Sequence, residues 1–128
     1  MIAALFLAGV LQPASQSVLS DPEENACYAG NSSQAGLEMC GKAALQRAEN
    51  WLSLYWRNTL SEYGNDNPRT TRLLNQSQRD WLKYRDAWCD IVAHDNHGAI
   101  PMTAWACKAK LTRERTAAVL DLIAGTNE

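Results

Sequence analysis

Four cysteines carry the most definite chemistry in this 128-residue sequence. They stand at Cys27, Cys40, Cys89 and Cys107. The apolar amino-terminal segment of this chain predicts export, and cysteines in an exported chain of this size are usually oxidised to disulfides. A zinc site is a weaker alternative because no C-x-x-C pair is present. The sequence therefore predicts two disulfide bonds.

The pairing of these cysteines is not settled by their number, since four cysteines allow three connectivities. A turn signal containing Gly and Asn lies between Cys27 and Cys40, and another lies between Cys89 and Cys107. Pairing of neighbours would close two short loops, each worth about 3 kcal/mol in the chain-entropy account of disulfide stability. We predict this nearest-neighbour pairing.

Side chains for catalysis are harder to assemble. Glu23 and Glu24 stand at a predicted helix start, where negative charge is favoured, and Asp86 and Asp90 lie on a charged helix face. With its thiols committed to disulfides, the chain keeps no cysteine nucleophile. It has no Gly-rich phosphate loop, nucleophile elbow or H-E-x-x-H motif. We predict a protein that is not an enzyme and needs no cofactor.

Two other sets of side chains leave alternatives open. Arg79, Arg85 and Arg115 could surround an anionic substrate in a small exported helical lyase or mutase. His94 and His97 could bind a metal if they shared one helix turn, although a helix end or a loop explains them better. Neither arrangement outweighs the prediction of a non-catalytic protein without a metal.

Helix-start and helix-stop residues divide the first half of the sequence. Asp21 followed by Pro22 predicts a helix start, and Gly30 ends that short helix. Ser33 is a candidate cap for a long second helix, and Gly64 offers its stop. The first half thus predicts a short helix followed by a long one.

Two further helices follow. A polar linker over residues 65–68 starts a third helix, which runs to about Ala93. Residues 94–101 are predicted to form a loop, and a last helix begins at about Met102. No segment shows the alternation typical of strands. The predicted fold class is all-α, a small antiparallel bundle of three longer helices and a short N-terminal helix, held by two disulfides.

Aromatic and aliphatic residues mark the faces on which these helices should pack. The third helix carries an apolar face with Leu74, Trp81, Tyr84, Trp88 and Val92. Gln78, Arg85 and Cys89 border that face at helical spacing. Trp51 and Trp105 are also expected to face the core. Trp56 is either a core-edge residue or an exposed aromatic that is available to a partner.

The amino-terminal segment has the pattern of a secretory signal peptide. Residues 2–11 form an apolar run that is too short for a membrane-spanning helix, which needs about 20 residues, and small and polar residues follow it. We predict a signal peptide over residues 1–17 and a single domain over residues 18–128. A buried first helix is the alternative, because the usual basic residues before the run are missing.

The charge balance argues against several classes of partner. The chain has 14 acidic and 12 basic residues, a net charge of −2. This balance predicts neither a broad basic surface for nucleic acid nor a polybasic patch for a membrane. The balance is compatible with a cationic partner but does not argue for one.

The chain resembles a known family. Gln78, Trp81, Tyr84, Arg85, Asp86 and Cys89 stand at the spacing of Q-x-x-W-x-x-[YF]-R-D-x-x-C, the signature of LprI-type lysozyme inhibitors. Upstream the resemblance continues with Cys40, Glu49 and Leu52, and downstream with Cys107, Thr112 and Arg115. It runs from about Cys27 to Leu122. The sequence departs from the usual residues of the family at Glu49, Ser53, Trp56 and Gly98-Ala99.

The resemblance also implies roles for single residues. Glu49 occupies the acidic position of the family and is the expected partner of Arg85, whose guanidinium borders an apolar face and needs an acid. Asp86 is not expected at the same site, because adjacent helix positions point about 100° apart. Thr112 and Arg115 should form a polar seam between the last helix and its neighbours.

The function implied by the resemblance is that of a periplasmic or secreted bacterial protein that binds lysozyme, or another peptidoglycan hydrolase, stoichiometrically. An envelope interaction or immunity-type protein with a different partner is the alternative, since function resides in surfaces and not in folds. Partner contacts are predicted in the loop, at His94, Asp95, Asn96 and His97, with Trp56 as the next candidate.

Overall fold

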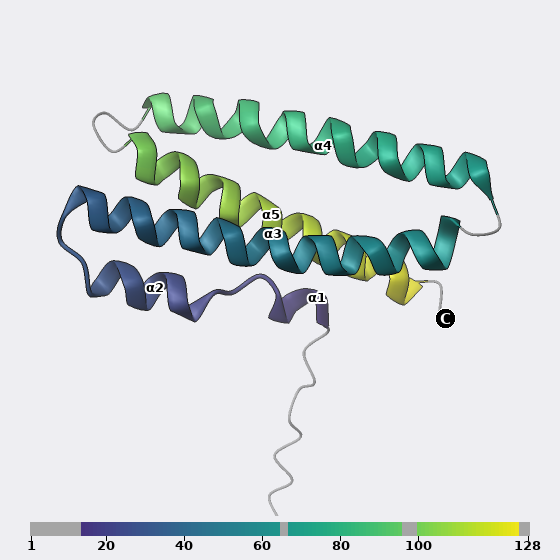
Figure 1. Cartoon of the computed structure of the whole chain (residues 1–128), viewed down its shortest axis with the longest axis horizontal. Helices are drawn as coiled ribbons and strands as arrows, with labels where there is room; N and C mark the ends of the chain where they lie inside the picture. Colours follow the sequence, from purple (N-terminus) through teal and green to yellow (C-terminus); the bar gives the residue numbers. More distant parts are fainter. Residues whose placement is uncertain (1–13, 65–66, 96–99, 126–128) are drawn as a thin grey trace, which may run out of the picture.

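The computed structural model describes residues 14–64, 67–95 and 100–125, which are predominantly helical (Figure 1). The helices are α1 (Ala14–Ser17), α2 (Pro22–Ala29), α3 (Gln34–Gly64), α4 (Pro68–Asp95) and α5 (Ile100–Gly125). The predicted all-α class is confirmed, with α2 as the short N-terminal helix and α3, α4 and α5 as the three longer ones. The four-residue helix α1 is an addition to the predicted set.

Local capping explains where three of these helices begin. The Asp21 carboxylate accepts a hydrogen bond from the Glu24 amide at 3.2 Å at the start of α2. Ser33 Oγ accepts one from the Gly36 amide at 3.0 Å at the start of α3. Asn67 Oδ1 caps α4 by accepting from the backbone of its first turn at 3.1 Å. The predicted helix starts are confirmed.

Consecutive long helices run antiparallel, so α3 and α5 are parallel to each other, and α5 contacts both α3 and α4 (Figure 1). The most extensive interface joins α3 to α5, whereas α3 and α4 touch only slightly. The short helix α2 packs on α3, and α1 packs on α5. The C-terminal ends of α2 and α4 therefore lie at the same end of the bundle as the N-terminal ends of α3 and α5 (Figure 1).

The core between α3 and α5 is built from small side chains. Ala44 and Leu45 of α3 pack with Ala109 of α5, and Trp105 packs against this cluster. The largest side chains with almost no solvent contact are Thr59, Thr112, Thr116, Cys40 and Cys89. Small side chains let the two helix axes approach closely, so the centre of the bundle has little room for aromatic rings.

This packing corrects the prediction for several aromatic residues. Trp51, Tyr84 and Trp88 are placed in the core by their helical spacing, but they are 53%, 55% and 46% exposed. On α4 the buried positions include Arg85 and Cys89, which the sequence places only at the border of the apolar face. The disulfide of Cys89 and the ion pair of Arg85 with Glu49 hold that side of α4 against α5 and α3.

The predicted loop over residues 94–101 is too long. Helix α4 continues through Asp95, and α5 begins at Ile100. Pro101 is tolerated in the first turn of α5, because the N–H groups of a first turn have no intrahelical partner. Residues 96–99 lie outside the described segments.

The amino-terminal prediction lies mostly outside the described residues, which begin at Ala14. Residues 14–17 form α1 against α5, and the signal peptide over residues 1–17 stays a prediction. None of the helices in the described segments is long and apolar enough to cross a membrane.

Candidate functional site

Both predicted disulfides are present, toward the same end of the bundle. Cys27 of α2 is bonded to Cys40 of α3 with a Cα–Cα distance of 5.7 Å. Cys89 of α4 is bonded to Cys107 of α5 with a Cα–Cα distance of 5.5 Å. The nearest-neighbour pairing is confirmed, and no cysteine is left free.

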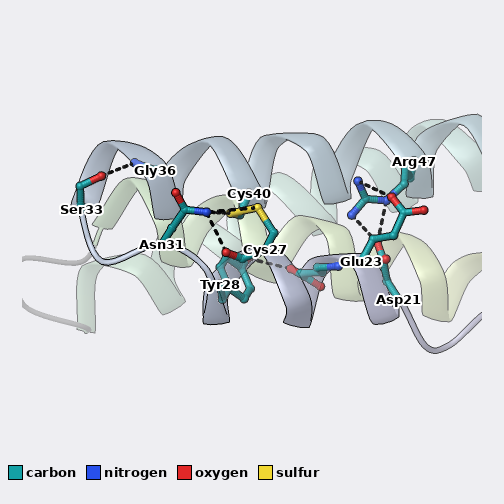
Figure 2. The surroundings of a disulfide bond; sticks show 10 residues. Asp21, Glu23, Cys27, Tyr28, Asn31, Ser33, Gly36, Cys40 and Arg47 are labelled. Atoms are coloured by element: carbon teal, nitrogen blue, oxygen red, sulfur yellow. Dashed lines mark hydrogen bonds and ion pairs between the residues drawn. A yellow bond between two sulfur atoms is a disulfide. The ribbon is translucent and has the colours of Figure 1, made fainter.

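Polar contacts surround the first disulfide and hold α2 on α3. Figure 2 shows Asn31 Nδ2 donating to the backbone oxygen of Cys27 at 2.8 Å beside the sulfur atoms. At the other end of α2, Arg47 Nη2 donates to Asp21 Oδ2 at 2.9 Å, and Arg47 Nη1 lies 3.4 Å from Glu23 Oε2 (Figure 2). Charged contacts thus secure the start of α2, and the disulfide secures its end.

Glu24 ties α2 to α5 from a buried position. Its Oε1 accepts from Arg113 Nη1 at 3.2 Å, and its Oε2 accepts from the Tyr28 hydroxyl at 2.8 Å. Burial, followed by the hydrogen bond to Glu24 and its negative charge, raises the pKa of the Tyr28 phenol well above its usual value. Sequence reasoning missed this cluster, because Glu24 in a first helical turn is easily taken for a surface charge.

Arg85 is the centre of a buried polar seam between α3, α4 and α5. It is 7% exposed, and its Nη1 lies 3.1 Å from Glu49 Oε1 and 3.2 Å from Thr112 Oγ1. The guanidinium carbon lies 5.5 Å from the centre of the Trp81 ring. The expected ion pair between Arg85 and Glu49 is present, and it crosses from α4 to α3.

Asp86 overturns one expectation. Arg85 Nε donates to Asp86 Oδ1 at 2.9 Å, although adjacent helix positions point apart. The arginine side chain is long enough to turn toward its neighbour, and Lys108 of α5 approaches the same carboxylate at 3.8 Å. Asp86 therefore belongs to the seam and forms its half-exposed edge.

Arg115 of α5 forms the second half of the seam. Its Nε donates to Gln78 Oε1 at 3.1 Å, and its Nη2 donates to Ser77 Oγ at 3.0 Å. Its guanidinium carbon lies 5.8 Å from the ring centres of both Trp56 and Trp81. Burial lowers the pKa of Arg115, yet a guanidinium remains charged in proteins. Trp56 is half-buried beside this cation.

The seam brings together most of the signature residues: Glu49, Gln78, Trp81, Arg85, Asp86, Thr112 and Arg115. A groove of about 350 Å³ opens between α3 and α4, with Ser53, Trp56 and Leu82 among its walls. Within the described residues, every buried side-chain nitrogen and oxygen has a hydrogen-bond partner. The seam therefore joins three helices, and its polar groups are hydrogen-bonded or ion-paired with one another.

Tyr84 is a signature residue that takes no part in the seam or in a disulfide. Its exposed ring stacks on Trp88 with the ring centres 6.4 Å apart, and Ile91 in the next turn is also exposed. These three side chains share one side of α4, and we call this surface the α4 aromatic face. Sequence reasoning missed it as a surface, because the same spacing is typical of a buried helix face.

The structure describes only part of the predicted partner loop. His94 is exposed in the last turn of α4, and Asp95 ends that helix. Asn96 and His97 lie outside the described residues. Among the residues that are described, no group of His, Cys, Asp or Glu is arranged to hold a metal ion.

Comparison with known proteins gives this arrangement a family. A sequence model described as "Lysozyme inhibitor LprI" matches residues 25–119, which include both disulfides and the whole seam. The chain belongs to the LprI lysozyme-inhibitor family. In this structure most of the signature residues hold α3, α4 and α5 together, whereas Tyr84 is 55% exposed and takes no part in the seam.

A curated protein shares part of this LprI sequence. An uncharacterized protein of Rhizobium meliloti (strain 1021) is 38% identical to it over 52 residues. The alignment covers 39% of this chain and 37% of that relative, so the chain spans well under half of the relative's length. No solved structure matches the chain.

Proposed function

We propose that this LprI-family chain is an exported bacterial protein that binds lysozyme, or a related peptidoglycan hydrolase, and inhibits it stoichiometrically. The observation that carries the proposal is the family match over residues 25–119, which spans the complete seam. Two disulfides suit an oxidising compartment outside the cytoplasm. Disulfides and buried ion pairs also make a rigid scaffold, and rigidity reduces the entropy lost on binding.

The α4 aromatic face is the surface that we propose for this partner. Adjacent exposed aromatic side chains are typical of interaction sites, where Tyr and Trp often contribute most of the binding energy. Cys89 follows Trp88 directly and bonds α4 to α5, so the base of this surface is held in place. Tyr84 supports the assignment, because it belongs to the signature and contributes nothing to the seam.

His94 and Asp95, the predicted partner residues that the structure describes, lie at the end of the same helix, beyond Ile91. We propose that they extend the α4 aromatic face toward the disulfide-bonded end of the bundle. Trp56 is a separate candidate at the rim of the groove between α3 and α4. It ranks second, because its ring already lies against Arg115.

A lysis assay tests both the function and the surface. The chain from residue 18 onward is mixed with lysozyme and a peptidoglycan suspension, and the fall in turbidity is recorded. We expect inhibition that saturates at an equimolar ratio. Tyr84→Ala combined with Trp88→Ala should weaken inhibition about 30-fold or more while helicity by circular dichroism is retained. Met39→Ala combined with Leu122→Ala removes two exposed apolar side chains from α3 and α5 and is the control, which should inhibit normally.

A second variant separates the two parts of the surface. Replacing residues 94–100 with a short Gly/Ser linker should reduce inhibition if this segment contacts the enzyme. Full inhibition by both the linker variant and the aromatic double variant would rule out this end of α4 and direct attention to Trp56. A folded wild-type chain without effect on any lysozyme would contradict the proposed function and favour an envelope interaction or immunity-type protein.

A further inference from the structure

A hollow of about 310 Å³ lies where the segment between α1 and α2 crosses α3 and α5. Its lining includes Asp21, Glu23, Arg47, Trp51, Tyr55 and Thr116, and among the described residues of the predicted signal peptide only Ser17. Neither the polar seam nor the α4 aromatic face contributes a residue to it. Ligand pockets in proteins begin at roughly 300 Å³, so the hollow has the size of a site for a small molecule.

One wall of the hollow is aromatic. Trp51 exposes 53% of its surface, and its ring stacks on Tyr55 with the ring centres 5.9 Å apart and the planes within 16°. The stack restricts the tryptophan while leaving much of the indole accessible. It therefore presents a flat apolar surface that is ordered before any ligand arrives.

The rim of the hollow is polar and ordered by ion pairs. Arg47 donates through both Nε and Nη2 to Asp21 Oδ2, at 3.1 and 2.9 Å, and its Nη1 lies 3.4 Å from Glu23 Oε2 (Figure 2). The Glu23 side chain is 76% exposed, so its carboxylate has room for a second partner. Fixed acceptors and donors thus stand beside the aromatic wall.

The charges of the lining cancel. Asp21 and Glu23 contribute two carboxylates, and Arg47 and Arg113 contribute two guanidinium groups. A neutral lining does not select a strongly charged ligand, because binding an ion would leave its charge uncompensated. The arrangement favours an uncharged molecule with an apolar face and with hydroxyl groups at its edge.

We propose that this hollow binds a neutral saccharide, with one pyranose ring against Trp51. A pyranose has a face of C–H groups that can lie on an indole, and its rim of hydroxyls both donates and accepts hydrogen bonds. Glu23 accepts from one hydroxyl, and the guanidinium of Arg47 donates to another. The proposal does not depend on inhibition of a hydrolase, since the residues involved lie on different helices from the α4 aromatic face.

The test is a titration of the nitrogen-15-labelled chain from residue 18 onward with N-acetylglucosamine and with glucose, followed at the indole N–H signals by NMR. We expect at least one of the two sugars to shift the Trp51 signal saturably while the Trp88 signal stays in place. Trp51→Ala should weaken binding about tenfold or more, and Glu23→Gln should weaken it measurably without disturbing the fold. Trp88→Ala is the matched control and should bind sugar like the wild type.

Three results would overturn the saccharide site. The first is a folded wild-type chain with no shift at about 10 mM of either sugar. The second is unchanged sugar binding by the Trp51→Ala variant. The third is an equal Trp51 shift with methylammonium chloride, which would indicate a cation site. The lysis assay reports on α4 and remains readable in each case, so failure here and failure of the proposed inhibition are distinguishable.

Discussion

Arg85 and Glu49, which are 36 positions apart in the sequence, form an ion pair of 3.1 Å that joins α4 to α3. The cation is the buried partner: the Arg85 side chain is 8% exposed, whereas that of Glu49 is 43% exposed. Asp86, the second acid on Arg85, is 52% exposed. Removing both acids therefore leaves a buried guanidinium without a counter-charge, and this destabilises the bundle.

Glu49→Gln combined with Asp86→Asn should lower the free energy of unfolding by about 2–3 kcal/mol, less than for fully buried pairs because both carboxylates are partly screened by water. Each single substitution should cost clearly less than half of this, since the other acid remains on Arg85. Urea unfolding measures the effect. The control is Glu62→Gln with Asp90→Asn, which removes the same charges from exposed positions on the same two helices.

Additive single effects would contradict this account of the Arg85 site. A further variant checks its cause. Arg85→Met in the background of Glu49→Gln and Asp86→Asn removes the stranded cation and should restore much of the lost stability.

The two disulfides should differ in what they protect. Their loops of 13 and 18 residues predict losses of about 3 kcal/mol each when either bond is removed by paired Cys→Ser substitution. Removing Cys27–Cys40 should raise amide hydrogen exchange mainly in α2, which the ion pairs of Arg47 and Arg113 still hold weakly. Removing Cys89–Cys107 should raise it in α4. Equal increases in every helix for both variants would show that the bundle opens only as a whole.

Ionisation of Tyr28 should lower the free energy of unfolding at alkaline pH. Its raised pKa means that the folded chain keeps the phenol proton to a higher pH than the unfolded chain, where the pKa is about 10. The resulting stabilisation is present in full below pH about 10 and is lost as pH rises further, because the unfolded chain releases the proton first. The charged groups that face this phenol are Glu24, Arg113 and Asp21.

Urea unfolding of wild type and Tyr28→Phe between pH about 8 and about 11.5 measures this dependence. The wild type should lose stability more steeply across that interval than the variant. Tyr84→Phe removes an exposed phenol and is the control, which should follow the wild type. Parallel curves for wild type and Tyr28→Phe would contradict the raised pKa.

Arg69 should be an unfavourable charge for helix α4. It lies in the first turn, where the helix dipole disfavours cations, and that turn contains no acidic residue. Arg69→Glu should therefore raise the free energy of unfolding by about 0.3–1 kcal/mol at low salt. Arg57→Glu makes the same charge change inside α3, before its last turn, with the neutral Ser53 and Ser61 four positions away, and should change little. An equal gain from both variants would point to net charge and not to the dipole.

Helix starts and disulfides could be derived from the sequence because the contacts that define them are local. A cap such as Asp21 or Ser33 bonds to an amide three positions away, so residue type and spacing are sufficient evidence. The disulfides close short loops across turns, which makes neighbouring cysteines the natural partners. The pairing of Arg85 with Glu49 needed the family resemblance, because no local rule connects residues on different helices.

Which side of each helix is buried could not be derived in the same way. Helical spacing placed Trp51 and Trp88 in the core, but it shows only that apolar residues share a side. Small residues such as Ala44 and Ala109 bring α3 and α5 close together, and the rings are left outside. The α4 aromatic face is therefore exposed because α3 and α5 pack closely against each other.

The sequence by itself determined the helical class and the starts of α2, α3 and α4, and its turn signals favoured the observed cysteine pairing among three possible ones. Tertiary structure decided which groups meet from distant positions, such as Glu24 and Arg113, which are 89 residues apart. It also decided that Arg47 and Trp51 border one hollow with Asp21. The physical reason is that burial and ion pairing depend on the volume and charge of neighbouring helices, and those neighbours are known only when the helices have packed.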